Sequence, residues 1–431
     1  MKSSMKFCIL FLLFHAFVFG KAKSEFQSAK SEYPQSFHVT VKNPMNSERN
    51  DVVIELDIKS VKAKHNNFNP DAFIVFDGEK ELPSQVEDVN GDRTPDRVLF
   101  VTNFRPNEQK DITVRFSKTG KKIRYYKKRT MATLARKVNY KLVKGEYTGG
   151  RFMDIDSTKV PQDHVAHDAL YRIEGPGWES DLITYRYYLD SRNRNDLFGK
   201  KKRELILDKV GVHDLVSNSM ESYTKMLDWG MDIFKVGESL GIGSIGMWHD
   251  GKVYTVSNTD STIVKVANNG PIESGIYSEY YDWKVGSGKY NLFSNLSICA
   301  GSRLTRTDLS ISGGKTKFCT GLVKHENTNF IKFNKTNSQW QYIGLYGEQS
   351  LAGPKDDLGI SVFYKKGDLI KSTEDSLSYI VVLKPTDGKL HYYFAAAWDK
   401  EPGGIKNETE FKSYLDKTIL ELDNPVTVKI D

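Results

Sequence analysis

The chain has 431 residues, a formal net charge of +7 and 27% charged residues. This length exceeds what one hydrophobic core usually supports, which favours two domains. The mildly basic balance, without a long block of like charges, does not indicate a nucleic-acid-binding protein. It is compatible with an acidic sugar as ligand.

The chain begins with a short basic segment, an apolar run from Phe7 to Phe19, and then Gly20-Lys21-Ala22. This pattern is typical of a signal peptide. The run is shorter than the roughly 20 residues that a membrane-spanning helix needs, and no second run of that length follows. We therefore expect residues 1–22 to be a signal peptide and the mature protein to be soluble and periplasmic, without membrane insertion.

Residues 35–120 alternate between apolar and polar side chains with a period of two. Phe37, Val39 and Val41, for example, share one face. Further strand-like runs are Val52–Ile58, Ala72–Phe76, Arg97–Val101 and Asp111–Phe116. Turn residues separate these runs at short intervals, which predicts a small Ig-like β-sandwich. A basic stretch from Lys118 to Arg129 follows, and we interpret it as a linker.

A group of oxygen-bearing side chains in this first region is spaced as in calcium-binding loops. It consists of Asp88, Asn90 and Asp92, with Asp96 beyond. The glutamate that would complete an EF-hand loop is missing. A polar turn between strands is therefore the favoured interpretation, and a structural calcium site is the alternative.

Residues 130–431 again show strand-like runs separated by glycine-containing turns. The turns His249–Lys252, Ser312–Lys315 and Pro385–Gly388 lie between β-rich runs and predict hairpins. Helical signals are few, and Glu408 to Lys417 is a candidate for one short helix. The pattern predicts an all-β protein in which this region is a large antiparallel β-sandwich, of the super-sandwich or mutarotase-like type, carrying the catalytic site.

Two cysteines follow the signal peptide, Cys299 and Cys319. Both lie in strand-like runs that flank Gly313-Gly314, so in an oxidising compartment they could form a disulfide. Two free thiols are the alternative. The sequence contains no Cys-x-x-Cys pair or Cys/His cluster of the kind that binds zinc, and we expect neither a metal nor a cofactor.

The segment from Asp163 to Lys202 is the most informative part of the chain. Ile183, Tyr185, Tyr187 and Leu189 fall on one face of a predicted strand, and Thr184, Arg186, Tyr188 and Asp190 fall on the other. An arginine, a phenol and a carboxylate on one face suit a sugar-binding cleft, whereas a solvated polar face is the structural alternative. The surrounding polar and aromatic residues favour the cleft: His164, His167, Trp178, Glu179, Arg192, Arg194 and Lys200.

Several of these residues are candidates for direct contact with a substrate. Trp178 follows Gly175-Pro176-Gly177, so we expect it on a loop where its indole stacks on a sugar ring. A buried core tryptophan is the alternative. Glu179, Asp190 and Lys200 are predicted to bind the substrate as well.

A glycine-rich segment runs from Asp228 to Trp248. It matches neither the dinucleotide-binding fingerprint nor the phosphate-binding loop. Its glycines therefore indicate bulges and close backbone packing in a sheet. Asp228, Asp232 and Lys235 remain candidates to project into the cleft.

Two stretches, RIEGPGWESDLITYRYYLDSRNRNDLFGKK and DWGMDIFKVGESLGIGSIGMW, resemble a family of exported proteins from polysaccharide-degrading marine and gut bacteria. The family is catalogued as domain of unknown function 4861, and the likeness spans most of the chain. One branch is similar to an oligosaccharide dehydratase acting on ulvan, the sulfated rhamnose–uronic acid polymer of green algae. The resemblance implies a hydro-lyase that removes water across C4–C5 of the glucuronic or iduronic acid at the non-reducing end. The product would be a 4,5-unsaturated uronyl residue, and the expected partner is an anionic, sulfated oligosaccharide.

This elimination takes a proton next to a carboxylate, so the site has to neutralise that carboxylate and supply a base and an acid. We assign Arg186 to the carboxylate and Tyr188 to the acid. His167 is assigned to the base, because histidine is largely neutral near pH 7. The reserve candidates are His164, Tyr171, His213 and His391.

Two other classes of function fit the same residues. A chain-cleaving polysaccharide lyase uses the same chemistry with a sugar as the leaving group. A non-catalytic sugar-binding sandwich leaves its ligand unchanged.

Overall fold

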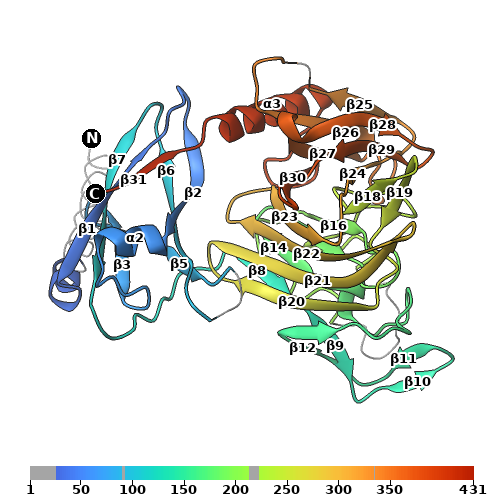
Figure 1. Ribbon diagram of the computed structural model, residues 1–431, viewed down its shortest axis with the longest axis horizontal. Helices are drawn as coiled ribbons and strands as arrows, with labels where there is room; N and C mark the ends of the chain where they lie inside the picture. The colour runs from blue at the N-terminus through green and yellow to red at the C-terminus, as the bar shows by residue number, and fades with distance from the viewer. Residues whose placement is uncertain (1–25, 90–92, 213–222, 334) are drawn as a thin grey trace, which may run out of the picture. The chain divides into compact units, whose positions relative to one another are not determined.

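The computed structural model describes residues 26–89, 93–212, 223–333 and 335–431 (Figure 1). The chain divides into two units. The first holds the residues up to Lys127 together with Asn424–Asp431, and the second is Lys128–Asp423. The predicted signal peptide, residues 1–22, lies outside the described residues, and so do Asn90 and Asp92 of the predicted polar turn, for which calcium binding was the alternative.

The first unit is a β-sandwich. Its five-stranded sheet has the order β31-β1-β7-β3-β4, and its three-stranded sheet has the order β2-β6-β5. Inward-facing side chains of both sheets, such as Val39 and Phe100, meet in one hydrophobic core. The elements are β1 (Gln35–Lys42), β2 (Arg49–Asp57), α2 (Ile58–Lys64), β3 (Phe73–Asp77), β4 (Lys80–Leu82), β5 (Ser84–Glu87), β6 (Arg97–Phe104), β7 (Gln109–Phe116) and β31 (Thr427–Ile430).

The last strand departs from the predicted domain boundary of 130–431. β31 pairs with β1 in antiparallel register, with Val39 opposite Ile430. The chain therefore leaves the first unit after β7 and returns to it at its C-terminal end.

The second unit is built on a nine-stranded sheet with the order β13-β20-β21-β22-β23-β30-β27-β26-β25. The sheet is antiparallel throughout. Its strands are β13 (Ser157–Lys159), β20 (Ser261–Asn269), β21 (Glu273–Val285), β22 (Gly288–Cys299), β23 (Thr305–Ser312), β25 (Thr328–Lys332), β26 (Trp340–Glu348), β27 (Asp357–Lys365) and β30 (Lys389–Trp398).

Two five-stranded sheets, β17-β16-β15-β14-β8 and β19-β18-β24-β29-β28, pack on one face of the nine-stranded sheet. Trp178 of β14, Phe318 of β24 and Leu292 of β22 share the resulting core. The strands are β8 (Thr130–Thr133), β14 (Gly177–Ser180), β15 (Thr184–Tyr187), β16 (Asn195–Lys200), β17 (Gly230–Asp232), β18 (Gly246–His249), β19 (Lys252–Thr255), β24 (Phe318–Val323), β28 (Leu369–Glu374) and β29 (Ser378–Leu383). The predicted all-β fold with a large antiparallel sandwich is confirmed.

Smaller elements complete this unit. They are β9 (Ala135–Val138) with β12 (Arg151–Asp154), the hairpin of β10 (Lys141–Val143) and β11 (Glu146–Thr148), and the 3-10 turns η1 (Arg172–Glu174) and η4 (Lys366–Asp368).

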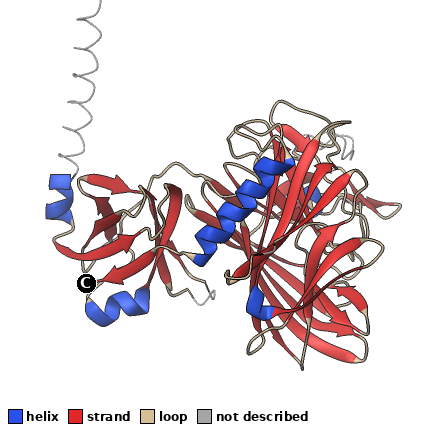
Figure 2. Ribbon diagram, turned by 90° about the horizontal axis from the view of Figure 1, so that it is seen from above, coloured by secondary structure: helices blue, strands red, loops and turns tan. Residues whose placement is uncertain are grey.

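The predicted helix exists as α3 (Glu408–Asp423) and is longer than expected. The Asn407 carboxamide accepts a hydrogen bond from the N–H of Glu410 at 2.9 Å and donates one to its side chain, which caps the helix start. Phe411, Leu415 and Ile419, four residues apart, pack on the opposite face of the nine-stranded sheet from the two smaller sheets. Figure 2 shows α3 lying along these strands.

One of the three predicted hairpins is confirmed. His249 pairs with Lys252 between β18 and β19. The predicted hairpins at Ser312–Lys315 and Pro385–Gly388 are wrong, because each of these turns carries the chain from one sheet to another. For the same reason Cys299 and Cys319 lie in different sheets, and they do not form a disulfide with each other.

Gly230 illustrates the close backbone packing expected of the glycine-rich segment. Its φ is +138°, and a Cβ at this position would overlap the carbonyl oxygen of Gly199 on the neighbouring strand. No helix among the described residues is long and apolar enough to cross a membrane.

Candidate active site

The loop that precedes β14 carries concentrated backbone strain. His167, Ala169, Ile173 and Glu174 all have positive φ, at 63°, 61°, 54° and 61°. For a β-branched residue such as Ile173 this conformation is a genuine outlier. Each such residue costs on the order of 1–3 kcal/mol and persists only where its surroundings impose it, often at a functional site.

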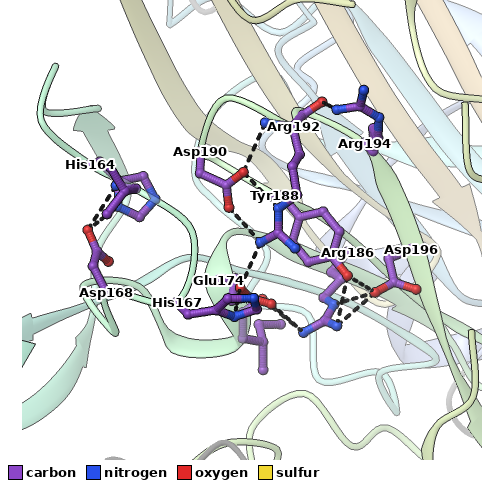
Figure 3. A network of polar contacts seen from close by, with 12 residues as sticks. His164, His167, Asp168, Glu174, Arg186, Tyr188, Asp190, Arg192, Arg194 and Asp196 are labelled. Atoms are coloured by element: carbon purple, nitrogen blue, oxygen red, sulfur yellow. Dashed lines mark hydrogen bonds and ion pairs between the residues drawn. The ribbon is translucent and has the colours of Figure 1, made fainter. Parts of the chain in front are cut away.

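His164 and Asp168 form a buried pair in this loop (Figure 3). The Nδ1 of His164 lies 2.7 Å from the carboxylate of Asp168, and both side chains are at most 3% exposed. The same carboxylate accepts hydrogen bonds from the N–H groups of Leu170 at 2.9 Å and Val165 at 3.2 Å. Asp168 is thus fixed by the backbone and in turn fixes the orientation of the imidazole.

The other ring nitrogen of His164, Nε2, is buried and has no hydrogen-bond partner among the described residues. In the tautomer whose Nδ1 donates to Asp168, Nε2 carries the lone pair of the ring. His164 lines a small cleft of about 100 Å³. The cleft is lined by Val160, Pro161, Gln162, His164, Leu189, Asp190, Ser191, Asn193, Val256, Ser257, Thr259 and Thr262.

The volume of this cleft lies below the roughly 300–1,000 Å³ of a complete small-molecule site. It has room for part of a ligand, such as one edge of a sugar ring. Its lining is mostly polar, so it offers hydrogen bonds rather than apolar contact. An oriented imidazole with a free lone pair in such a place has the geometry of a general base.

Glu174 links a second histidine to the interior. Its Oε1 lies 2.9 Å from Nδ1 of His167 and 2.7 Å from Nη2 of Arg192. Its Oε2 lies 3.7 Å from Nη1 of Arg186. The side chain of His167 is 65% exposed whereas that of Glu174 is 8% exposed, so this ion pair joins a surface residue to a buried one.

Arg192 connects this network to the cleft. Its guanidinium holds Asp190, a residue that lines the cleft, through bonds of 2.8 Å and 2.6 Å, and lies over the ring of Tyr188 at 3.7 Å. Burial alone would raise the pKa of Asp190, but the hydrogen bonds from Arg192 outweigh it and keep that pKa below the usual range. The Nη1 of Arg192 makes no hydrogen bond or ion pair within the described part of the chain.

Arg186 lies deeper and is fully engaged. It contacts Asp196 at 2.7 Å and Asp232 at 2.6 Å, and its side chain is 3% exposed. Asp196 stands opposite Arg186 in the pairing of β15 with β16, which explains this contact. The assignment of Arg186 to a substrate carboxylate is therefore corrected: protein groups engage all three of its guanidinium nitrogens, and the side chain is buried.

Tyr188 is engaged in the same cluster. Its Oη accepts a hydrogen bond from Arg186 at 3.2 Å and donates one to Asp196. Burial raises the pKa of Tyr188 well above its usual value of 10. The phenol is neutral, as expected for an acid, but its proton points at Asp196 and not at a ligand, so the predicted role of Tyr188 is corrected as well.

Asp232 has an unusual environment for a carboxyl group. Burial and the neighbouring charge of Asp196 raise its pKa from 3.8 to about 7, against the opposing effect of Arg186. The group therefore titrates close to neutral pH.

The residues predicted on β14 and β16 are structural. Trp178 lies in β14, not on a loop, is fully buried, and donates a hydrogen bond from Nε1 to Thr305 at 2.8 Å. Glu179 and Lys200 form an ion pair of 2.9 Å in which both side chains are 0% exposed. The polar face of the predicted strand is closed by a second hydrophobic cluster, which includes Phe198 and Leu207, and this excludes substrate from Glu179 and Lys200.

None of the remaining candidates among the described residues lines the cleft, although Tyr171 packs edge-on against His164 at 5.1 Å. Asp228 and Lys235 are exposed on the surface. Tyr171 is buried and bonded to Thr158 at 3.1 Å. The ring of His391 in β30 lies 5.4 Å from that of Trp340 and is tilted against it, next to the cluster on the α3 side of the nine-stranded sheet. His213 lies outside the described residues.

Sequence reasoning did not single out Asp168, Glu174 or Asp196. The spacing of four residues between His164 and Asp168 was a usable signal. The other two become visible only when the pairing of β15 with β16 and the path of the strained loop are known. Among the described residues, no three His, Cys, Asp or Glu side chains are grouped so as to hold a metal ion.

Three solved structures resemble this chain at low identity. A protein in the glycosyl hydrolase family 38 from Enterococcus faecalis has 8% identity and a TM-score of 0.42, over 92% of this chain and 47% of that chain. An α-mannosidase from Enterococcus faecalis V583 has 7% identity and a TM-score of 0.43, over 92% and 46%. A protein provisionally assigned as an aldose 1-epimerase, from Klebsiella pneumoniae, has 11% identity and a TM-score of 0.29, over 63% and 93%.

The chain thus spans about half the length of the two Enterococcus structures. At these TM-scores the likenesses carry no argument about activity. No curated protein matches the chain. The family model for DUF4861, a domain of unknown function, matches residues 41–428 and so extends over nearly all of both units. The chain belongs to the DUF4861 family.

Proposed function

We propose that this protein is an oligosaccharide dehydratase, which removes water across C4–C5 of the uronic acid at the non-reducing end of an ulvan-type oligosaccharide. The observation that carries the proposal is the buried His164–Asp168 pair: His164 lines a polar cleft together with Asp190, the partner of Arg192, and its Nε2 has no hydrogen-bond partner among the described residues. The resemblance of the two quoted segments to the dehydratase branch of the family supports the choice of substrate.

Proton removal from C5 is the difficult step, because the adjacent carboxylate is already negatively charged. A cation beside that carboxylate stabilises the charge that develops in the transition state. Arg192 suits this role better than Arg186, because its guanidinium is 18% exposed and its Nη1 is free within the described residues. We therefore assign the substrate carboxylate to Arg192 in place of Arg186, which the strand pattern had suggested.

His164 is then the base. Its Nε2 takes the C5 proton, the C5–H electron pair forms the C4–C5 double bond, and the C4–O bond breaks. His167, held through Nδ1 by Glu174, gives a proton to the departing 4-hydroxyl, which leaves as water. The two histidines lie three residues apart in one strained loop, and each has its own carboxylate.

The test is incubation of the purified protein with saturated ulvan oligosaccharides, followed by mass spectrometry and ultraviolet absorbance. The expected product is lighter by one water, absorbs in the ultraviolet and keeps its full chain length. Shorter fragments as the primary product would mean a chain-cleaving lyase. Unchanged oligosaccharide that nevertheless binds would mean a sugar-binding protein.

We further propose that the protein works in the periplasm, on the grounds of the basic and apolar N-terminal pattern. Cell fractionation with N-terminal sequencing tests this. Retention of residues 1–22 in a cytosolic protein would contradict it.

A further inference from the structure

A second and larger cleft lies in another part of the second unit. Its volume is about 270 Å³. It is lined by Phe330, Lys332, Ile343, Ser372, Thr373, Glu374, Tyr379 and Ile380, and it shares no residue with the cleft beside His164. The lining comes from β25 and β26 of the nine-stranded sheet and from β28 and β29 of a five-stranded sheet, which lie close together in Figure 1.

Both β25 and β28 are the outermost strands of their sheets. Each therefore has one row of backbone N–H and C=O groups that is not used in sheet pairing. Ser372 and Thr373 of β28 line the cleft and bring hydroxyl groups to it.

An aromatic pair forms the apolar part of this cleft. The rings of Phe330 and Tyr379 are stacked, with centroids 4.2 Å apart and an angle of 24° between their planes. Phe330 is 41% exposed, which is unusual for a phenylalanine and leaves ring surface open to solvent. A flat, supported aromatic ring beside hydroxyl groups suits the face of a sugar ring.

The charges around the cleft favour an anion. Lys324 lies over the ring of Tyr379 at 5.0 Å and is balanced by Glu374 at 3.1 Å. Lys332 lines the cleft and makes no ion pair among the described residues. One positive charge is therefore left over.

We propose that this cleft is an accessory binding site for an anionic sugar residue of a polysaccharide, separate from the reaction site. The ring of the sugar stacks on Phe330, and its carboxylate or sulfate pairs with Lys332. Such a site would hold the protein on a long chain while the cleft beside His164 takes the chain end. Binding here does not depend on the proposed reaction, only on an acidic sugar.

The test is retardation of the purified protein in native gels that contain ulvan polymer. The reference gel contains the same polymer after carboxyl reduction and desulfation, which removes its charge but keeps its sugar backbone. We expect retardation only by the charged polymer. Equal retardation in both gels would overturn the anionic assignment, and no retardation in either gel would overturn the site.

Variants locate the binding within the cleft. Phe330→Ala should weaken binding about ten-fold, as expected for the loss of one aromatic stacking contact. Phe330→Tyr keeps the ring and should bind like the parent protein, whereas Phe330→Leu keeps only apolar bulk and should not. Lys332→Gln should weaken binding a few-fold and remove most of its salt dependence.

Two controls separate this proposal from the reaction and from loss of folding. Tyr125→Ala removes a ring that is 88% exposed in the first unit and should leave retardation unchanged. His164→Gln should abolish turnover but leave retardation by the polymer unchanged. Phe330→Leu should abolish retardation by the polymer but still turn over short oligosaccharides. Parent-like retardation of folded Phe330→Leu, with thermal unfolding checked, would overturn the proposal.

Discussion

Two groups of charged residues in the second unit differ in how completely they are paired. Arg186 is surrounded by Asp196, Asp232 and Tyr188, and its guanidinium is fully engaged. His164 lines a cleft and has one hydrogen-bond partner, Asp168, while its other ring nitrogen has none among the described residues. The first group is expected to hold the fold together, because buried charges are stable only when paired. The second leaves a reactive atom available, which is what catalysis requires.

The sharpest test of this contrast is removal of the imidazole of His164. His164→Gln should lower the initial rate of unsaturated product formation by about 10²–10⁴-fold, the usual contribution of a general base. The rate is measured by ultraviolet absorbance on saturated oligosaccharides. Asp168→Asn should also slow the reaction, because the ring then loses the acceptor that fixes its tautomer. A folded His164→Gln protein with the parent rate would move the base elsewhere.

The paired group should respond in stability instead. Arg186→Met leaves Asp196 and Asp232 without their shared cation, and we expect the free energy of unfolding to fall by about 3–5 kcal/mol. Urea denaturation measures this change. Arg186→Lys keeps the charge but not the forked geometry, so its free energy of unfolding should lie between those of the parent protein and Arg186→Met. A loss below about 1 kcal/mol would mean that this cluster is hydrated and not structural.

The raised pKa of Asp232 gives the same group a pH dependence. The pKa of Asp232 is about 7 in the folded protein, whereas its ordinary value of 3.8 applies in the unfolded chain. Between these two pH values the folded protein therefore binds more protons than the unfolded chain. The contribution of Asp232 to the free energy of unfolding therefore decreases as the pH rises from about 4 to 7.

Asp232→Asn should remove this slope, a difference of a few kcal/mol at most across the range. Chemical denaturation at a series of pH values compares the variant with the parent. Parallel stability curves for the two proteins would show that Asp232 does not titrate in this range.

Substitution of Trp178 distinguishes its role in core packing from the sugar-stacking role predicted from the sequence. Trp178→Phe removes the hydrogen bond to Thr305 and part of the core contact, so the free energy of unfolding should fall by about 1–3 kcal/mol. The KM for oligosaccharide should not change. A large rise in KM at unchanged stability would restore the role predicted from the sequence.

The smallest effects are expected at the exposed candidates. Asp228→Asn and Lys235→Gln should each change stability by no more than about 0.5 kcal/mol and leave the rate unaltered. Thermal unfolding and the same absorbance assay check both. A strong loss of rate in either variant would enlarge the candidate site towards β17.

The sequence was enough to predict which side chains of β15 share a face, but not that its polar face is buried. The alternation around Tyr185 and Arg186 is correct: Tyr185 faces the nine-stranded sheet, and Arg186 faces the other way. Alternation does not reveal whether the second face meets solvent or another part of the chain. That depends on the packing of residues such as Ile206 and Leu207, which cover this face and whose N–H groups bond to Glu179.

The histidines show the same limit at shorter range. The sequence indicated that His164 and His167 belong to a functional segment, and both lie in the loop before β14. The contact of Nδ1 with Asp168 decides which ring nitrogen of His164 is left without a partner, and that contact forms in a loop where Ile173 adopts a positive φ that β-branched residues rarely show. Local strain of this kind cannot be predicted from composition or periodicity.

The pairing of β31 with β1 makes the second unit an insertion within the chain of the first. Two peptide connections therefore join the units, one near Lys127 and one near Asp423. A protease that cuts only the basic linker would leave them covalently attached. A fragment that ends before Asn424 would expose the edge of β1 from Val39 to Lys42, and unpaired strand edges promote aggregation. Dissection of this protein thus requires fusing the last strand back to the first unit.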